Sequence, residues 1–189
     1  MVKINIDPVK LGNLEVGWWR AHHEGDKTKL LELLVEYNVN FYGFSQVEAK
    51  DAIGDLIQGV KYHDTREWAK AIDSVSKFYL RVKEKTELSF DPEEIAGLEV
   101  GWWKLHDELE NNPDKSRLAE AFAKLYATQF GKEVEDLLKA GNFKAEATKE
   151  HDLAEDRKTP SSEIEAHWNK AKQLLIGFHS ELKRVFAKL

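Results

Sequence analysis

The chain has 189 residues and a mass of 21.8 kDa, with 28 Lys and Arg against 34 Asp and Glu, which gives a net charge of −6. This acidic balance argues against nucleic acid or an anionic membrane surface as a partner, because both require a basic surface. The absence of cysteine excludes disulfides, thiol nucleophiles and cysteine-ligated zinc or iron–sulfur clusters. Any metal ion must therefore be bound by His and carboxylate side chains.

The hydrophobic content is 42%, which is enough for a buried core, and the charged residues are spread along the whole chain. No run of about 18 consecutive apolar residues is present. Residues 1–8 also lack the apolar segment of a secretory signal. We therefore expect a compact cytoplasmic protein that does not associate with membranes.

The sequence contains an internal repeat. Residues 7–24 and 91–108 are identical at ten of 18 positions, including the block Leu-Glu-Val-Gly-Trp-Trp. After a four-residue insertion near Pro113 and a later twelve-residue insertion, the similarity continues through pairs such as His63/His151 and Trp68/Trp168. The repeat predicts two similar units, residues 1–88 and 89–189, which form either two bundles or one compact domain with pseudo-two-fold symmetry.

Helix signals begin each unit. Asp7 and Asp91 precede Pro8 and Pro92, an arrangement typical of an N-cap followed by proline at the first helical position. A further helix is expected to begin after Ser45, where a glutamate three residues later completes a capping box. The two duplicated helices are expected at the centre of the pseudo-symmetric arrangement.

Apolar stripes mark further helices. One face of the second helix carries Leu30, Leu34, Tyr37 and Phe41. The stripe of the fourth helix consists of Trp68, Ile72, Val75, Tyr79 and Val82. These spacings predict an all-α protein, a tandem repeat of two units of about four antiparallel helices with a helical-bundle architecture. Seven or eight helices are expected in total, with Gly17 and Gly101 at close helix crossings.

The first helix of each unit places a carboxylate and an imidazole on an apolar face. Glu15 and His22 lie seven residues apart, as do Glu99 and His106. This is about 10.5 Å along a helix axis, too far for direct pairing. A buried carboxylate requires a partner, a metal ion or a proton. Each glutamate is therefore expected to find either a hydrogen-bonding partner on another helix or a metal.

A second repeated element, at residues 63–67 and 151–155, supplies candidate partners. One interpretation is a metal site in each unit that binds iron, manganese or zinc, since His and carboxylate groups inside a bundle are typical metal ligands. The candidate ligands are Glu15, His22, His63, Glu67, Glu99, His106, His151 and Glu155. The alternative is that Asp64 and Asp152 begin capping boxes, which would place the adjacent histidines just outside a helix.

Two functional hypotheses follow. The first is a non-catalytic all-helical protein that binds a protein or a small ligand, because nearly every repeated residue has a packing or capping explanation. The second is a metalloprotein with His and carboxylate ligands and oxygen or redox chemistry. No phosphate-binding loop, nucleophile elbow or His-Glu-x-x-His helix is present. His167 and His179 have no histidine counterpart in the first unit and receive no role.

Overall fold

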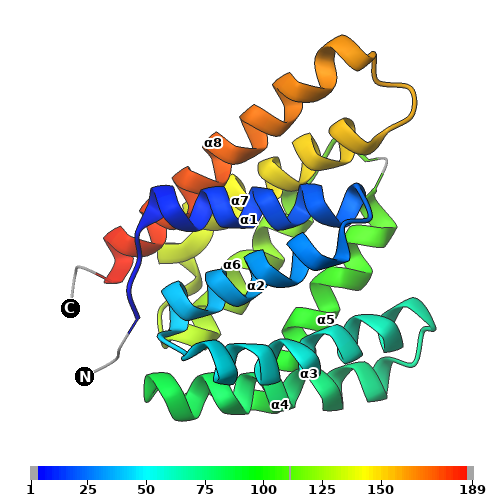
Figure 1. The fold of residues 1–189 in the computed structure, drawn as a ribbon. Coiled ribbons are helices and arrows are strands. Elements are labelled where there is room, and N and C mark those ends of the chain that lie inside the picture. The colour runs from blue at the N-terminus through cyan, green and yellow to red at the C-terminus, as the bar shows by residue number, and fades with distance from the viewer. Residues whose placement is uncertain (1–3, 111, 187–189) are drawn as a thin grey trace.

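A computed structural model describes residues 4–110 and 112–186 and is all-helical, with no strand in these residues (Figure 1). This confirms the predicted all-α class. None of the described helices combines the length and apolar character needed to cross a bilayer. The eight helices are α1 (Pro8–His23), α2 (Lys27–Tyr42), α3 (Gln46–Asp64), α4 (Trp68–Thr86), α5 (Pro92–Leu109), α6 (Ser116–Phe130), α7 (Val134–Glu155) and α8 (Ser161–Phe186).

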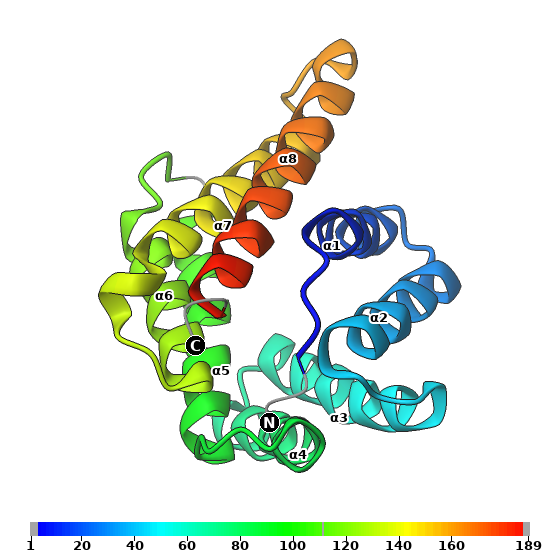
Figure 2. The ribbon, with the colours of Figure 1, turned by 90° about the vertical axis from the view of Figure 1, so that its left-hand side faces the viewer.

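The helices form a closed ring. Each helix packs against the next one in the chain, and α8 packs against α1 to complete the circle. Figure 2 shows this ring, from which the outer ends of α7 and α8 extend at the top. α1 packs mainly against α2 and α8, whereas α5 packs mainly against α4 and α6. The expectation that α1 and α5 form a central pair is therefore wrong.

The predicted helix starts are confirmed. Asp7 accepts a hydrogen bond from the backbone N–H of Lys10, and Asp91 caps α5 in the same manner. At the start of α3, Ser45 and Glu48 form the complete capping box. In each case the cap satisfies backbone N–H groups that the first helical turn leaves free.

The capping boxes proposed at Asp64 and Asp152 are wrong. Asp64 is the last residue of α3, and Glu67 precedes α4 without a side-chain capping hydrogen bond. Asp152 lies inside α7, which continues to Glu155. Because α3 extends to Asp64 and α7 to Glu155, His63 and His151 are helical residues whose side chains project from α3 and α7.

One hydrophobic cluster includes residues from all eight helices, so the ring encloses a continuous core. Its largest fully buried side chains include Phe41, Phe122 and Phe178. The expected close crossings are found at only one of the two glycines. A Cβ at Gly17 would lie 3.2 Å from Leu33 Cδ1, whereas a Cβ at Gly101 would meet nothing within 4 Å.

Candidate functional site

A buried polar cluster lies where α1, α7 and α8 meet. The carboxylate of Glu15 is 2% exposed and accepts hydrogen bonds from Lys144 Nζ at 2.8 Å and His179 Nε2 at 2.9 Å. The glutamate comes from α1, the lysine from α7 and the histidine from α8. The expected buried partner for Glu15 on another helix is thus confirmed.

Lys144 is held by aromatic side chains as well as by Glu15. Its ammonium group donates a hydrogen bond to Tyr126 Oη at 2.8 Å. It also lies 5.4, 5.2 and 4.8 Å from the ring centroids of Phe122, Tyr126 and Phe178, respectively. Cation–π attraction to these rings compensates part of the hydration that the ammonium loses on burial.

The pKa values of this cluster favour an ion pair. Burial alone would raise the pKa of Glu15, but the charge of Lys144 and the hydrogen bond from His179 lower it to about 2. Burial alone would lower the pKa of Lys144, yet Glu15 raises it above its usual value. The pKa of His179 is lowered, chiefly by burial. Glu15 therefore has the charged partner that a buried carboxylate requires, without a metal ion or a bound proton.

Glu99, the sequence match of Glu15, has different partners. It accepts hydrogen bonds from Tyr79 Oη at 2.8 Å and from Trp103 Nε1 at 3.2 Å. Burial raises the pKa of Glu99 because these donors compensate the lost hydration only in part. Tyr79 lies on α4 and Glu99 on α5, so the expected partner on another helix is confirmed here too.

A second cluster brings together His106 from α5 with His151 and Asp152 from α7. One donor atom of each side chain lies within 4.8 Å of the others. The Oδ1 atom of Asp152 is 3.0 Å from His106 Nε2 and 3.3 Å from His151 Nδ1. The side chains are between 10% and 25% exposed, so the cluster lies in a shallow position that solvent reaches.

The outer atoms of this cluster also have partners. Lys115 Nζ lies 2.7 Å from Asp152 Oδ2, and Glu155 Oε1 lies 2.9 Å from His151 Nε2. The same Glu155 oxygen is 3.3 Å from Nδ1 of His23 on α1. A continuous row of imidazoles and carboxylates therefore runs from α5 across α7 to α1.

Protonation equilibria reflect these contacts. Burial alone would lower the pKa of His151, but hydrogen bonds to Asp152 and Glu155 raise it to about 9. Burial alone would raise the pKa of Asp152, but hydrogen bonds from His106, His151 and Lys115 lower it well below its usual value. In the absence of a metal ion, the cluster thus holds an imidazolium between two carboxylates.

Aromatic rings fix the orientation of His151. Its ring is edge-on to Trp19 at a centroid distance of 5.2 Å and to Trp168 at 5.6 Å. His63, its sequence match, has the same type of contact with Trp68 at 5.3 Å and Trp103 at 5.7 Å. These two histidines therefore have similar apolar surroundings but different polar neighbours.

The other candidate ligands lie apart from one another. His22 is exposed, and His63 Nε2 lies 3.3 Å from a carboxylate oxygen of Asp107. Glu67 pairs with Lys70 and accepts a hydrogen bond from Thr65. Of the eight predicted ligands, His106, His151 and Glu155 are therefore joined directly in one cluster, whereas no metal-ligand cluster is found around His63 in the described residues.

Four important residues were not predicted from the sequence, namely Lys115, Lys144, Asp152 and His179. Lys144 occupies the buried stripe of α7 that also contains Ala140, Gly141 and Thr148. A lysine between small residues at helical spacing is the signal that would have revealed it. The sequence pattern around Asp152 predicts only a helix cap, and the match of His179 in the first unit is Tyr79, which indicates no shared role.

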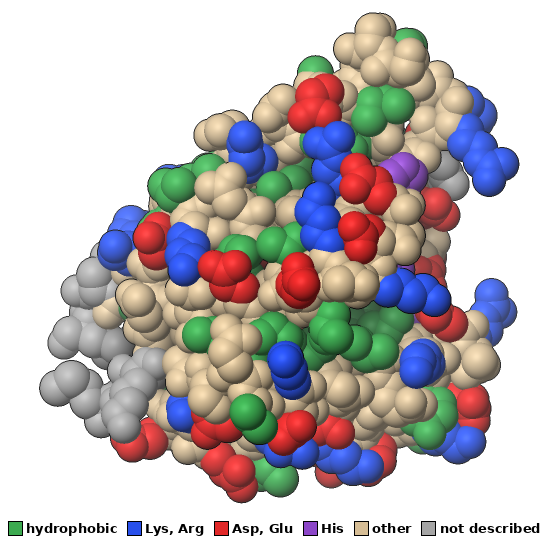
Figure 3. All heavy atoms as spheres, viewed as in Figure 1, with side chains coloured by type: hydrophobic (Ala, Val, Ile, Leu, Met, Phe, Trp, Pro, Cys, Tyr) green, Lys and Arg blue, Asp and Glu red, His purple; other side chains and the backbone are tan. Residues whose placement is uncertain are grey.

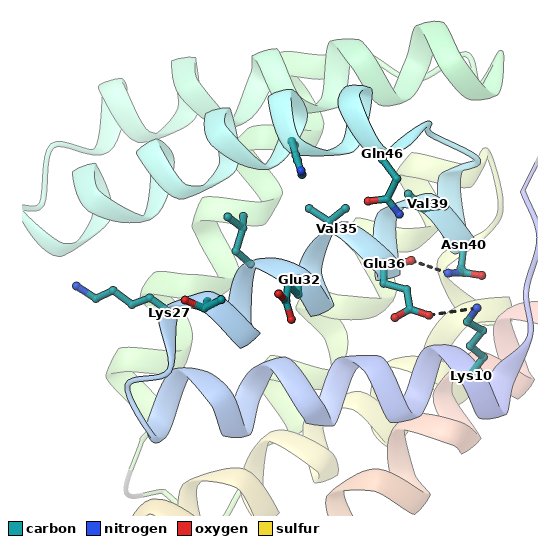
Figure 4. A pocket seen from close by; sticks show the side chains of 11 residues that line it. Lys10, Lys27, Glu32, Val35, Glu36, Val39, Asn40 and Gln46 are labelled. Carbon is teal, nitrogen blue, oxygen red and sulfur yellow. Dashed lines mark hydrogen bonds and ion pairs between the residues drawn. The ribbon is translucent and has the colours of Figure 1, made fainter.

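A separate groove lies between α1 and α3, with α2 as its floor (Figure 4). Its volume is about 730 Å³. The apolar side chains of Leu31, Val35 and Val39 line the floor, and Lys10 pairs with Glu36 across it at 3.3 Å. Figure 3 shows hydrophobic side chains in this part of the surface beside acidic and basic ones.

No protein-family model, curated protein or solved structure matches this chain.

Proposed function

We propose that this protein binds a divalent transition-metal ion through His106, His151 and Asp152. The supporting observation is that one donor atom from each side chain lies within 4.8 Å of the others. Ligand atoms bound at 2.0–2.1 Å to a tetrahedral zinc ion are about 3.3–3.4 Å apart. The spacings of 3.0 and 3.3 Å around Asp152 Oδ1 are thus within a few tenths of an ångström of the separation required.

The groups behind the ligands support a metal site. Metal-bound histidines usually donate their second ring N–H to a carboxylate, which fixes the ring orientation. Glu155 occupies that position relative to His151, at 2.9 Å from Nε2. Lys115 holds the outer oxygen of Asp152, which leaves the inner oxygen directed at the two histidines. Two of the three ligands therefore have an orienting partner.

The donor set limits which metals fit. Two imidazoles and one carboxylate suit zinc or ferrous iron, and the absence of a second carboxylate ligand makes the site less suitable for calcium or magnesium. Three protein ligands also leave at least one coordination position open for water or another small molecule. The proposed role is therefore that of a mononuclear metal-binding protein with an accessible metal.

Metal titration of the chelator-treated protein tests this proposal. We expect one equivalent of Zn²⁺ to bind in isothermal titration calorimetry. Asp152→Asn and His106→Ala should each weaken binding by about a hundredfold or more, because each removes one of three ligands. The sequence-matched variants Asp64→Asn and His22→Ala are the controls and should bind Zn²⁺ as the wild type does.

Elemental analysis of untagged protein purified without chelator gives the native metal. Iron, manganese or zinc near one equivalent would agree with the proposal. Wild-type Zn²⁺ affinity in both Asp152→Asn and His106→Ala, with circular dichroism showing intact helices, would contradict it. Equal losses of Zn²⁺ affinity in the two control variants would also count against a metal site between α5 and α7.

We further propose that the two halves of the chain arose by tandem duplication. The repeated sequence is the first support. The contact of Glu15 on α1 with His179 on α8 has a counterpart in the contact of Glu99 on α5 with Tyr79 on α4. Similarly, His151 contacts Trp19 and Trp168. Its sequence match, His63, contacts the matching tryptophans Trp103 and Trp68.

A second candidate function is binding of a small organic ligand or a protein segment in the groove formed by α1, α2 and α3. The specific observation is an open groove of about 730 Å³ with an apolar floor. Pockets of this size suit ligands with both apolar and polar groups. A protein that takes up no metal after reconstitution would leave this function as the remaining candidate.

A further inference from the structure

Lys115 has an unusual position for a lysine. Its side chain is only 1% exposed, and its ammonium group lies between the end of α5 and the proposed metal site. The ammonium donates hydrogen bonds to the carbonyl oxygen of Leu109 at 2.5 Å and to Asp152 Oδ2 at 2.7 Å. It thus caps the C-terminus of α5 and compensates the charge of the one carboxylate in the ligand set.

The first-repeat match of this lysine, Lys27, is exposed, and the match of Asp152, Asp64, is 68% exposed. A buried ammonium behind a carboxylate is therefore specific to the second-repeat cluster. Burying a charge costs free energy unless partners compensate it. The buried position of Lys115 therefore points to an effect of its charge on this site.

The charges around the site leave a bound dication uncompensated. Asp152 is its one carboxylate ligand, and Lys115 offsets that negative charge. Glu155 is the remaining carboxylate in contact with a ligand, and it is shared between His151 and His23. The loaded site therefore keeps a net positive charge even when Glu155 is counted as ionised.

We infer that the metal-loaded site takes a small anion as its additional ligand, and that Lys115 provides the charge that favours it. This inference rests on the proposed metal site. His106 is 25% exposed, so an anion can approach from its side. Lys115 lies on the buried side of Asp152 and acts through charge rather than by direct contact with the anion.

Visible absorption of Co²⁺-loaded protein provides the test, because the Co²⁺ bands respond to a change of ligand. Formate is the probe and is titrated to 0.1 M. We expect saturable band shifts in the wild type. Lys115→Met should bind formate about tenfold more weakly, a difference of about 1.4 kcal/mol, since a buried positive charge near the anion is lost.

Two controls separate charge from structure. Lys115→Arg keeps the charge and should keep most of the formate affinity, whereas Lys27→Met changes an exposed lysine and should have no effect. Formate is titrated into protein saturated with Co²⁺, because Lys115→Met also removes the group that holds Asp152 and should weaken Co²⁺ binding. A merely structural role would weaken Co²⁺ binding but leave the formate affinity of the Co²⁺-loaded variant within twofold of the wild type.

Distinct outcomes identify which proposal fails. If Co²⁺ does not bind to the wild type, the metal site itself is wrong. Stoichiometric Co²⁺ binding without any formate-dependent band shift would overturn the anion inference alone. Formate affinities within twofold for wild type and Lys115→Met would show that the lysine does not provide the charge. Should Lys115→Met fail to fold, Lys115→Gln replaces it in the same titration.

Discussion

The contacts between α8 and α1 and between α4 and α5 join residues at matching positions of the sequence repeat but differ in chemistry. In the first, Glu15 forms a buried ion pair with Lys144 and accepts a hydrogen bond from His179. In the second, Glu99 accepts hydrogen bonds from the neutral donors Tyr79 and Trp103. Lys144 and His179 hydrogen-bond to Glu15 and its pKa is lowered, whereas burial raises the pKa of Glu99.

The two matched histidines, His63 and His151, also differ mainly in their polar neighbours. Both are oriented by tryptophan rings, but His151 additionally faces Asp152, Glu155 and His106. The aromatic contacts preserve the position of the ring, while the polar neighbours determine its chemistry. The proposed metal site is confined to one half of the molecule for this reason.

The largest expected difference between the two contacts comes from removing the charge of each glutamate. Glu15→Gln leaves the Lys144 ammonium buried without a counter-charge, which should lower the free energy of unfolding by about 3–5 kcal/mol. Glu99→Gln should cost less than about 1.5 kcal/mol, because the amide oxygen can still accept from Trp103 and the Tyr79 hydroxyl can accept from the amide NH₂. Urea unfolding of both variants measures the difference, and equal losses would refute it.

The dependence of stability on pH sharpens this comparison. The pKa of Glu15 falls from 4.5 to about 2 on folding, so its contribution is complete above pH 4.5 and is lost as pH falls through 2. The loss is about 3 kcal/mol at most. The pKa of His151 rises from 6.5 to about 9, so its contribution is complete below pH 6.5 and is lost as pH rises through 9.

Unfolding free energies of metal-free protein, measured between pH 2 and pH 10, test both limits. Glu15→Gln should make the unfolding free energy less dependent on pH at acidic pH, and His151→Gln should do the same at alkaline pH. Glu99→Gln is the control for the acid side, because the pKa of Glu99 shifts in the opposite direction. If Glu15→Gln lost stability at acidic pH as the wild type does, the ion pair would not be the cause of that loss.

The smallest expected effect concerns the matched glycines. Gly101→Ala should raise the free energy of unfolding by about 0.5–1 kcal/mol, since alanine favours the helix and its Cβ would meet nothing within 4 Å. Gly17→Ala should raise the free energy of unfolding by less, because the alanine Cβ would lie 3.2 Å from Leu33 Cδ1. Thermal unfolding compares the two variants, and a larger gain at Gly17 would contradict the packing difference.

Much of the helical structure could be predicted from the sequence because its signals are local. Asp7-Pro8, Asp91-Pro92 and the Ser45–Glu48 box mark helix starts within a few residues of chain. The capping boxes proposed at Asp64 and Asp152 failed because the same letters also fit the end of a helix. Only packing against neighbouring helices determines that α3 continues through His63 to Asp64 and that α7 continues to Glu155.

The site was less predictable because its contacts join distant residues. The requirement that buried Glu15 find a partner was evident, but the identity of that partner, Lys144, depends on how α7 passes α1. Asp152 was visible in the sequence but was assigned to the backbone rather than to a histidine. Lys115 follows an insertion that has no counterpart in the first half, so the repeat gave no indication of its role.

The closure of the ring by α8 against α1 has a consequence for synthesis. Glu15 is separated by 129 residues from Lys144 and by 164 residues from His179. At about 5–20 residues per second, a ribosome needs roughly 8–33 s to add the second interval. During that time α1 has no α8 to cover it, and its apolar face stays accessible to chaperones. The helix α1, which is synthesised long before α8, is thus among the last to reach its final environment.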